Sequence, residues 1–544
     1  MRVLVFNGWA AGPETWRLCG FPRDWTFDYI EQLDGLPEKI ADGFDDVVLV
    51  GFSMGGTSAL RFLLKHPEKV RGLILVSTTA RMMEDPASGW KGLSERRLAA
   101  LRLGTELVFR DDPSPLYDRA SMARGLECLH DVDVREALKG LGRTDFPVYV
   151  FHSENDGIVR RNNVDFFRSV FPQAKVTLVP GNEHVLPITI PEKIDAAVRE
   201  CLLRCSVRIL FVWTGVTSYM ADCWRTLQRE LRGGELRILI EDQVSGRDFE
   251  KGKVLAGLDC TVVGKGECPD LGSLLPEGWR PDVVFAVGWH SPLVRAIVAD
   301  RAWAGIPKVC CFDLPWDGSL RRIAARWVLA RFLRNYTAAY VPGRACAEYA
   351  EWLGFGRIDR GLFSIDTRRF AAAPSLRKGF LFVGRFAPEK RVDLVAAAWR
   401  RYRDNGGTWA IDFYGSGPLA PEAADPGLRV HPFAQTDDMP RIYREHACLV
   451  LASDFDPWPL VVLEAKASGC RVVMTDRCTN RYELADGNDA VVAAGDVEAM
   501  AAAMMKMERD GSPSERTDLT PWDCGTWAER TMGIAADLIG EEEA

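Results

Sequence analysis

Short apolar runs alternate with amphipathic stretches along almost the whole chain. In its N-terminal part these runs predict strands at residues 3–6, 47–51, 72–76, 148–151 and 175–179. The stretches at 57–65 and 162–170 repeat their apolar residues at helical spacing. Because strands that alternate with helices build parallel sheets, the pattern predicts an α/β fold here.

The segment 81–142 interrupts this alternation. It is rich in charge, its apolar residues follow a helical pattern at 95–101 and 119–129, and it has no strand signal. We expect it to form a short helical lid above the carboxyl ends of the strands.

The alternation then starts afresh twice. After a first strand at 206–212, further strands are expected at 236–240, 261–263, 282–287, 307–312 and 338–341. An Ala- and Pro-containing stretch at 371–375 resembles a linker, and strands follow at 379–384, 410–414, 429–431, 448–451 and 471–475. The pattern therefore predicts three domains, at 1–205 (with the lid at about 81–142), 206–375 and 376–544.

Composition places the chain among ordinary globular proteins. Of its 544 residues 47% are hydrophobic and 26% are charged, and the net charge of −8 argues against a dedicated nucleic-acid binder. The 14 cysteines are scattered, without zinc spacing, so they predict packed thiols in a reducing compartment. The N-terminal apolar run is too short for a signal peptide, and no run reaches the ~18 residues of a membrane span, so a cytoplasmic location is expected.

The first candidate for chemistry is the sequence Gly-Phe-Ser-Met-Gly-Gly at 51–56, directly after an apolar run. A serine between small residues, at a tight turn from strand to helix, is lifted clear of the backbone and can act as a nucleophile. Ser53 occupies this position. As an alternative, Ser53 is a plain turn residue.

An acid and a histidine follow Ser53 in the order expected of a catalytic triad. Asp156 comes just after the strand at 148–151, and His184 just after the strand at 175–179. His184 would take the serine proton, and Asp156 would fix the histidine tautomer. The backbone N–H groups of Met54 and Trp9 would form the oxyanion hole. Structural loop roles for the histidine and the acid remain the alternative.

These motifs resemble the α/β-hydrolase family over most of residues 1–203. The Gly-Trp loop, the serine turn and the short lid look most like pimeloyl-acyl-carrier-protein methyl ester esterases, which serve biotin biosynthesis. The resemblance implies an ester substrate that is attached to an acyl-carrier protein. Those esterases have a histidine before Gly-Trp, and this chain has Asn7.

The second candidate for chemistry lies in the third domain. A glycosyltransferase needs cations and helix N-termini near the donor phosphates, and carboxylates that bind ribose and sugar hydroxyls. Arg385 and Lys390 follow a strand and a glycine turn, and Gly415 and Gly417 form a second glycine turn. Solvated loop charges are the alternative interpretation of the two cations.

Two carboxylates complete this set. Asp456 and Glu464 are separated by seven residues, and Glu464 is expected to begin a helix that faces the phosphates. The two aspartates at 437–438 lie in a polar loop, and no Asp-x-Asp follows a strand. The sequence therefore predicts neither a catalytic metal nor a cofactor.

The third domain, together with the second, resembles retaining glycosyltransferases of family 4, which have two Rossmann-like domains in the GT-B arrangement. The resemblance covers roughly 206–535. The family pattern is Glu, seven residues, Glu, and here Asp456 stands at the first position. The resemblance implies that Asp456 contacts the transferred sugar of a nucleoside-diphosphate sugar, that Glu464 binds its ribose, and that Arg385 and Lys390 bind its diphosphate.

The resemblance also assigns the domain at 206–375 to an acceptor that the sequence does not identify. Gly215 lies at the first turn of this domain, where the backbone would approach the substrate. His290 either lines the cleft or is an ordinary loop histidine. The stretch at 522–539 looks like the helix that crosses back onto this domain.

The segment 319–335 is basic and amphipathic, with arginines among apolar residues. Two interpretations remain open. The segment forms a peripheral contact with an anionic membrane, or it is a half-buried helix whose arginines extend to solvent.

Together these patterns predict a bifunctional enzyme in which a serine esterase is fused to a retaining glycosyltransferase. One alternative is that only the transferase is catalytic, with the hydrolase-like domain recruiting a partner. Another is that the esterase acts in the same pathway, on an acylated sugar or lipid.

Overall fold

A computed structural model describes residues 2–8, 13–19, 26–30, 46–100, 132–141, 146–231, 233–242, 250–267, 269–371, 377–423, 425–511 and 517–543. The chain forms two compact units. The first comprises Met1–Ser206 with Arg232–Gly234, and the second Val207–Leu231 with Glu235–Ala544.

The first unit is built on a six-stranded parallel sheet with the order β2-β1-β3-β4-β5-β6. Its strands are β1 (Arg2–Phe6), β2 (Thr26–Ile30), β3 (Val47–Phe52), β4 (Val70–Val76), β5 (Val148–Ser153) and β6 (Lys175–Val179). Its described helices are α2 (Met54–Lys65), α5 (Arg135–Gly140), α6 (Asn162–Val170), α7 (Leu186–Thr189) and α8 (Pro191–Ser206).

Alternate residues of the central strands feed two separate cores, one on each face of this sheet. Leu4 and Leu49 pack with side chains of α2 and α6. Val3 and Val48 point the other way and pack with side chains of α8. Since both faces are covered, the strands are apolar throughout, which explains the continuous runs in the sequence.

The described part of the expected lid is only partly helical. Residues 95–100 are helical, and α5 lies near the C-terminal end of the expected lid. The remaining described part forms isolated β-bridges, which join Arg81 to Asp133, Met83 to Leu93 and Asp85 to Trp90. The helix expected at 119–129 lies outside the described residues.

The second unit contains two parallel sheets. The first has the order β13-β12-β11-β10-β7-β8-β9. Its strands are β7 (Arg208–Thr214), β8 (Glu235–Glu241), β9 (Cys260–Val263), β10 (Val283–Val287), β11 (Lys308–Cys311), β12 (Ala338–Val341) and β13 (Ile358–Arg360). Its helices are α9 (Ser218–Glu230), α10 (Lys251–Val254), α11 (Leu271–Leu274), α12 (Pro292–Val298), α13 (Leu320–Leu333) and α14 (Arg344–Leu353).

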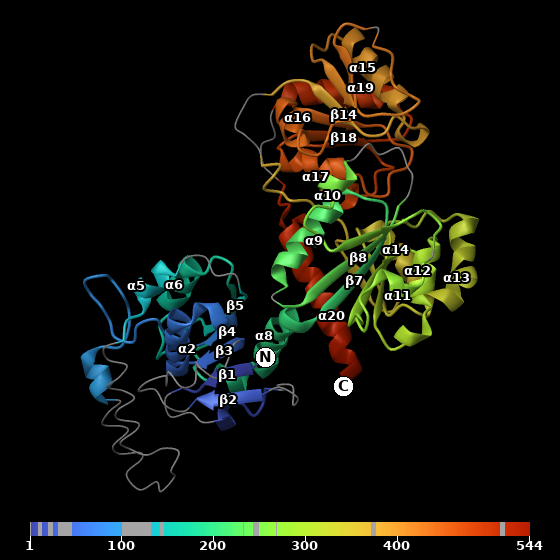
Figure 1. Cartoon of the computed structure of the whole chain (residues 1–544). Helices are drawn as coiled ribbons and strands as arrows, with labels where there is room; N and C mark the ends of the chain where they lie inside the picture. The colour runs from blue at the N-terminus through green and yellow to red at the C-terminus, as the bar shows by residue number, and fades with distance from the viewer. Residues whose placement is uncertain are drawn as a thin grey trace. The chain divides into compact units, whose positions relative to one another are not determined.

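The other sheet of this unit has the order β16-β15-β14-β17-β18-β19. Its strands are β14 (Phe380–Val383), β15 (Ile411–Tyr414), β16 (Leu428–His431), β17 (Cys448–Leu451), β18 (Arg471–Thr475) and β19 (Ala490–Val492). Its helices are α15 (Val392–Asp404), α16 (Met439–Glu445), α17 (Leu460–Ala467), α18 (Arg481–Leu484) and α19 (Val497–Asp510). Figure 1 shows α15 and α19 on one face of this sheet and α17 on the other.

The last helix, α20 (Cys524–Glu543), returns to the seven-stranded sheet and packs against α9. Trp527 donates a hydrogen bond from Nε1 to the Leu362 carbonyl at 2.7 Å, and the Sγ atoms of Cys223 and Cys524 lie 3.6 Å apart. The predicted α/β class with three parallel sheets is therefore confirmed. Among the described helices, none has the length and apolar character needed to cross a bilayer.

Candidate active sites

Ser53 lies at the turn between β3 and α2, in an unusual backbone conformation. Its φ is 52° and its ψ is −119°, and its N–H donates to the Val76 carbonyl at 2.8 Å. A non-glycine residue held at positive φ carries strain of about 1–3 kcal/mol, which the surrounding structure must sustain. The turn leaves the Ser53 hydroxyl at the N-terminus of α2.

The glycines beside Ser53 are required because the turn packs against neighbouring backbone. A Cβ atom on Gly55 would lie 2.2 Å from the Phe6 carbonyl oxygen, and one on Gly56 would lie 1.9 Å from Thr78 Oγ1. A Cβ atom on Gly51 would lie 2.4 Å from the Gly56 Cα. Such distances exclude a side chain at all three positions, so the small residues of the motif follow from steric contact.

The structure brings Ser53, His184 and Asp156 into one hydrogen-bonded chain. The Ser53 Oγ lies 2.9 Å from His184 Nε2, and His184 Nδ1 lies 2.8 Å from Asp156 Oδ2. The backbone N–H groups of Ile158 and Val159 donate to Asp156 Oδ1 at 2.8 and 3.0 Å. The arrangement is the one that lets a histidine accept a serine proton while a carboxylate holds the ring.

Two opposing effects act on the buried carboxyl of Asp156. Burial pushes its pKa upward, and the hydrogen bonds from His184, Ile158 and Val159 push it downward. The hydrogen bonds prevail and the pKa lies below its usual value, so Asp156 is a carboxylate at neutral pH.

Two further serines support the His184 loop. The Ser77 hydroxyl donates to the His184 carbonyl at 2.8 Å, and the Ser153 hydroxyl donates to the Glu183 carbonyl. The sequence analysis missed both. Ser77, like Ser53, has a positive φ, of 46°. No local sequence motif predicts this conformation.

Of the two expected oxyanion-hole donors, only Met54 is described. Met54 is the first residue of α2, where backbone N–H groups have no intrahelical partner. Trp9 lies outside the described residues. Asn7 is 4% exposed and accepts a hydrogen bond from Trp16 Nε1 at 2.8 Å, and its Nδ2 has no partner among the described residues. His152 is buried, as a packed residue would be, and burial lowers its pKa.

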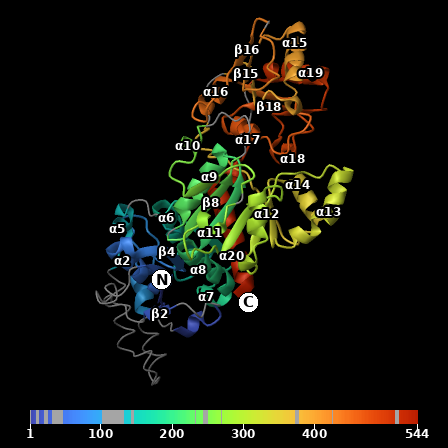
Figure 2. The same ribbon diagram turned by 45° about the vertical axis from the view of Figure 1, so that its right-hand side comes forward.

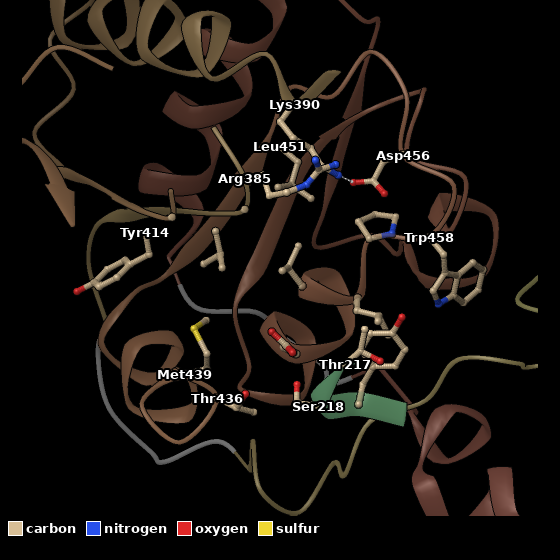
Figure 3. A pocket seen from close by; sticks show the side chains of 18 of the residues that line it. Thr217, Ser218, Arg385, Lys390, Tyr414, Thr436, Met439, Leu451, Asp456 and Trp458 are labelled. Carbon is tan, nitrogen blue, oxygen red and sulfur yellow. Dashed lines mark hydrogen bonds and ion pairs between the residues drawn. The ribbon is translucent and has the colours of Figure 1, made fainter. Parts of the chain in front are cut away.

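The second candidate site is a cavity of about 380 Å³ between the two sheets of the second unit. Its walls include four of the predicted residues from the six-stranded domain: Arg385, Lys390, Asp456 and Glu464. Gly415 also lines it. The seven-stranded domain contributes residues that the sequence analysis missed: Thr217, Ser218, Tyr219, Asp313 and Phe363. In Figure 3, Thr217 and Ser218 face the opening from the side opposite Lys390.

Lys390 and Asp456 are paired directly within this cavity. The Lys390 Nζ lies 2.5 Å from Asp456 Oδ2, and Asp456 is only 6% exposed (Figure 3). Burial raises the Asp456 pKa, and the Lys390 ammonium offsets part of that rise. Arg385 pairs with Glu389 at 2.6 Å. Both cations therefore stand at the cavity wall with carboxylate partners.

Glu464 lies on the wall of the cavity beside Tyr443, whose hydroxyl donates to Glu464 Oε2 at 2.7 Å. Burial raises the pKa of this carboxyl, and the Tyr443 hydrogen bond lowers it in part. The expectation that Glu464 begins a helix is wrong. The helix α17 begins at Leu460, immediately after Pro459 at its N-cap, so Glu464 sits in the second turn. The proline fits this start because it has no N–H to satisfy.

The glycine turns of this domain pack against each other. A Cβ atom on Gly415 would lie 2.0 Å from the Gly384 carbonyl oxygen, and one on Gly417 would lie 2.5 Å from the Phe386 carbonyl oxygen. Gly417 is absent from the described cavity wall, as is Gly215. Gly215, in the seven-stranded domain, directly follows β7 with a φ of 74°, and its N–H donates to the Glu241 carbonyl at 2.9 Å. Their contribution is to shape the turns.

Two aromatic residues extend the cavity wall. Trp458 is 5% exposed, and its Nε1–H has no partner among the described residues. The Tyr414 ring stacks on His431 with centroids 4.3 Å apart. His290 is exposed and does not line the cavity, which favours the loop interpretation of this residue. Within the described ranges, no cluster of three or more His, Cys, Asp or Glu side chains is arranged to hold a metal ion.

A hydrogen-bonded Ser-His-Asp chain on a six-stranded parallel sheet is typical of a hydrolase-like domain. Two Rossmann-like parallel sheets with a cavity between them, lined by charged residues of both signs, are typical of the GT-B arrangement. Comparison with known families agrees with both. Residues 25–108 match the alpha/beta hydrolase fold, residues 214–360 a glycosyl transferase 4-like domain, and residues 377–510 the glycosyl transferases group 1. The chain thus joins an α/β-hydrolase domain to two glycosyltransferase family 4 domains of the GT-B type.

Individual relatives cover the two halves separately. A pimeloyl-[acyl-carrier protein] methyl ester esterase from Salmonella agona is 24% identical over 233 residues, which cover 35% of this chain and 89% of the relative. An esterase from Exiguobacterium antarcticum has 17% identity and a TM-score of 0.30, covering 36% of this chain and 90% of its own. The Anabaena protein Alr3699/HepE, solved with UDP and glucose, has 14% identity and a TM-score of 0.46, covering 62% of this chain and 98% of its own.

Proposed function

We propose that the first unit is a serine esterase that works through an acyl-enzyme. The observation that carries this proposal is the hydrogen-bonded chain from Ser53 through His184 to Asp156. His184 takes the proton of Ser53 as the oxygen attacks the ester carbonyl, and the Met54 N–H stabilises the resulting oxyanion. The protonated His184 then donates to the departing alcohol, and a water molecule releases the acid by the same steps.

The ester is proposed to be the methyl ester of an acyl chain on an acyl-carrier protein. The relative that bears this name in Salmonella supports the choice. A role in biotin biosynthesis follows only if this substrate is right. Asn7, in place of the histidine of those esterases, lies beside the serine turn, because the Asn7 carbonyl oxygen would be 2.3 Å from a Cβ on Gly55. The substrate assignment therefore needs its own assay, separate from the test of the triad.

A fluorophosphonate probe tests the triad directly, because it phosphonylates only an activated serine. We expect the full chain to be labelled at Ser53, as located by peptide mass spectrometry. The Ser53→Ala variant should lose the label, and a matched Ser169→Ala variant on the exposed side of α6 should keep it. Labelling that is absent from the wild type, or that persists in Ser53→Ala, would contradict the proposal.

We propose that the second unit is a retaining glycosyltransferase that uses a nucleoside-diphosphate sugar. The observation that carries this proposal is the cavity that brings Arg385, Lys390, Asp456 and Glu464 together. The cations stabilise the charge of the leaving diphosphate, and Glu464 accepts hydrogen bonds from the ribose hydroxyls. Asp456 accepts hydrogen bonds from the transferred sugar. The alternative, in which this is the only active domain, stands if the probe fails at Ser53.

Thermal shift with nucleoside diphosphates tests the donor site. UDP, GDP, ADP and CDP are compared, and at least one should raise the unfolding midpoint of the second unit. A ligand present at about 100 times its Kd stabilises the folded state by about 2.7 kcal/mol. The Arg385→Gln variant should weaken this shift, whereas Arg368→Gln, which removes an exposed arginine outside the cavity wall, should not. If no nucleotide shifts the folded wild type, the transferase proposal fails.

A further inference from the structure

The helix α13 has two apolar faces, and only one of them is buried. On its inner side Leu329, Phe332 and Leu333 pack into the core of the seven-stranded domain. On its outer side Leu320, Trp327 and Val328 are 83%, 65% and 78% exposed. A contiguous apolar patch on the surface of a protein often marks a site of interaction. The outer side of α13 is therefore a candidate docking surface.

The exposed residues form one continuous stripe along the helix. Positions 320, 324, 327, 328 and 331 follow the i, i+4, i+7, i+8, i+11 spacing that places residues on one helical face. The stripe begins with Leu320, continues through Ala324 to Trp327 and Val328, and ends at Arg331. Figures 1 and 2 both show α13 on the outside of its domain, beside α14.

The arginines of α13 divide into two groups. Arg322 and Arg326 lie over the rings of Tyr349 and Trp352, at 4.8 and 5.3 Å from the ring centroids, and hold the helix to α14. The second group (Arg321, Arg331 and Arg334) is exposed and has no ion-pair partner in the part of the chain that the structure describes. This second group borders the apolar stripe.

The surroundings of the stripe are cationic although the whole chain is acidic. No Asp or Glu occurs between Asp317 and Glu348, whereas six arginines do, in a protein of net charge −8. Asp317 lies 3.7 Å from Arg322, and Glu348 is paired with Arg344 at 3.1 Å. An apolar stripe bordered by unpaired arginines complements a surface that is apolar inside and negatively charged outside.

We propose that the outer face of α13 docks flat on an anionic phospholipid membrane. The side chains of Leu320, Trp327 and Val328 enter the boundary between headgroups and acyl chains, and Arg321, Arg331 and Arg334 contact lipid phosphates. Partial insertion of one amphipathic helix face needs no membrane-spanning segment. The proposal goes beyond the two activities proposed above and holds whether or not either domain turns over a substrate.

Co-sedimentation of the full chain with vesicles tests the docking. Vesicles of phosphatidylcholine alone are compared with vesicles that also contain phosphatidylglycerol. We expect binding to the mixed vesicles that weakens as salt is added, because the attraction of exposed charges is screened within about 10 Å at 0.1 M salt. Failure of the wild type to bind the mixed vesicles, or equal binding to both kinds, would overturn the proposal.

Two triple variants separate the contributions of the apolar and the charged side chains to membrane binding. Leu320→Gln/Trp327→Gln/Val328→Gln should lower the partition coefficient at least about tenfold. Replacement of the three exposed arginines by Gln should lower it about a hundredfold, since each cation near an anionic surface contributes about fivefold. All six side chains are exposed, so the thermal midpoint should change little. The largest expected effect is the loss of the edge contact between the rings of Trp327 and Trp352.

Matched controls lie elsewhere on the chain. Val262→Gln/Val491→Gln removes apolar side chains that are 46% and 43% exposed, and Arg368→Gln/Arg509→Gln removes two exposed arginines. Both controls should bind the mixed vesicles like the wild type. If the outer-face variants bind like the wild type, or instead only convert a dimer into a monomer, the stripe is covered by something other than a membrane and the proposal fails.

Discussion

At the residue scale, Ser53 and the glycines around it form a strained turn that the rest of the unit holds in place. Ser53 keeps a φ of 52° at the start of α2, a conformation that costs a non-glycine residue about 1–3 kcal/mol. Gly55 lies against the carbonyl oxygens of Phe6 and Asn7, at 2.2 and 2.3 Å from the site of a Cβ, so α2 starts in contact with the end of β1. The position of the Ser53 hydroxyl therefore depends on the absence of a methyl group at Gly55.

The Gly55→Ala variant tests this dependence. The new Cβ would force α2 from β1 and move the Ser53 hydroxyl away from His184. We expect esterase kcat/KM to fall at least about a hundredfold, because misplacement by about 1 Å has that effect on catalysis. Gly140→Ala is the matched control, since a Cβ there meets nothing within 4 Å. Equal rates for the two variants would show that the turn does not depend on this contact.

Asp456 is one methylene shorter than the glutamate of the family pattern and is paired with a lysine in this structure. Its carboxylate is almost fully buried and lies 2.5 Å from the Lys390 Nζ, so in this structure it is paired with the lysine ammonium. If the diphosphate of the proposed donor binds Lys390, Asp456 is released to accept hydrogen bonds from the sugar hydroxyls. The proposed role of Asp456 thus includes a change of partner on donor binding.

At the element scale, Asp412 ties three elements of the donor-binding domain together. This β15 carboxylate accepts hydrogen bonds from His431 at 2.6 Å and from His446 at 3.1 Å, and it also pairs with Arg429. His431 in turn stacks on Tyr414, which lines the cavity. Burial pushes the Asp412 pKa upward, but the hydrogen bonds from His446, Arg429 and His431 hold it well below its usual range.

This pKa predicts a pH-dependent contribution to stability. A carboxyl whose pKa is lower in the folded state stabilises the fold above its unfolded pKa of about 3.9, and loses that effect as the pH falls towards the folded pKa. At pH 7, Asp412→Asn should lower the thermal midpoint of the second unit by roughly 5–10 °C, because it breaks a buried ion pair. Below about pH 4 the difference from the wild type should shrink.

The matched control is Asp425→Asn, which removes an exposed partner of Arg400. Exposed pairs contribute only about 0–1 kcal/mol, so its midpoint should stay near that of the wild type at every pH. A difference between Asp412→Asn and the wild type that does not change with pH would contradict the assigned charge state of Asp412. Calorimetry resolves the transition of the second unit from that of the first.

Also at the element scale, the strands that the sequence analysis missed are all edge strands. The strands β2, β13 and β19 each end their sheet. Two of them carry acidic residues, with the sequences Thr-Phe-Asp-Tyr-Ile and Ile-Asp-Arg, and the third, Ala-Val-Val, is only three residues long. An edge strand is less buried, so it needs fewer apolar residues and gives a weaker signal.

At the scale of the whole molecule, each of the two units has its own sheets and cores. The alternation of strands and helices was sufficient to predict three parallel sheets, because that pattern is local in sequence. The Ser53, Asp156 and His184 set was also predictable, because parallel strands bring their carboxyl ends to one edge of a sheet.

Contacts between distant segments were not predictable in this way. The Ser77 hydroxyl supports a loop 107 positions away, and the cavity wall from Thr217 to Tyr219 meets Asp456 only in the folded second unit. Such partners depend on packing between elements, which the sequence pattern does not contain. The start of α17 was misplaced for a different reason: Pro459 at its N-cap marks the start locally, and this signal was not used in the prediction.

Two separate active sites on one chain should respond independently to substitution. Ester hydrolysis and the release of nucleoside diphosphate from a sugar donor are therefore measured on the same full-length preparations. Wild type is compared with Ser53→Ala and Asp456→Asn. The donor is the one whose nucleotide gives the largest thermal shift, and Asp454→Asn, which removes a partner of Arg391, is the control for the second site.

We predict that Ser53→Ala loses hydrolysis at least about a thousandfold and keeps donor turnover, because loss of the nucleophile removes the acyl-enzyme route. Asp456→Asn should lose donor turnover at least about a hundredfold and keep hydrolysis, because a donor-binding carboxylate is removed. Asp454→Asn should keep both rates. If either variant loses both rates, or if Ser53→Ala hydrolyses esters like the wild type, the claim of two independent active sites is contradicted.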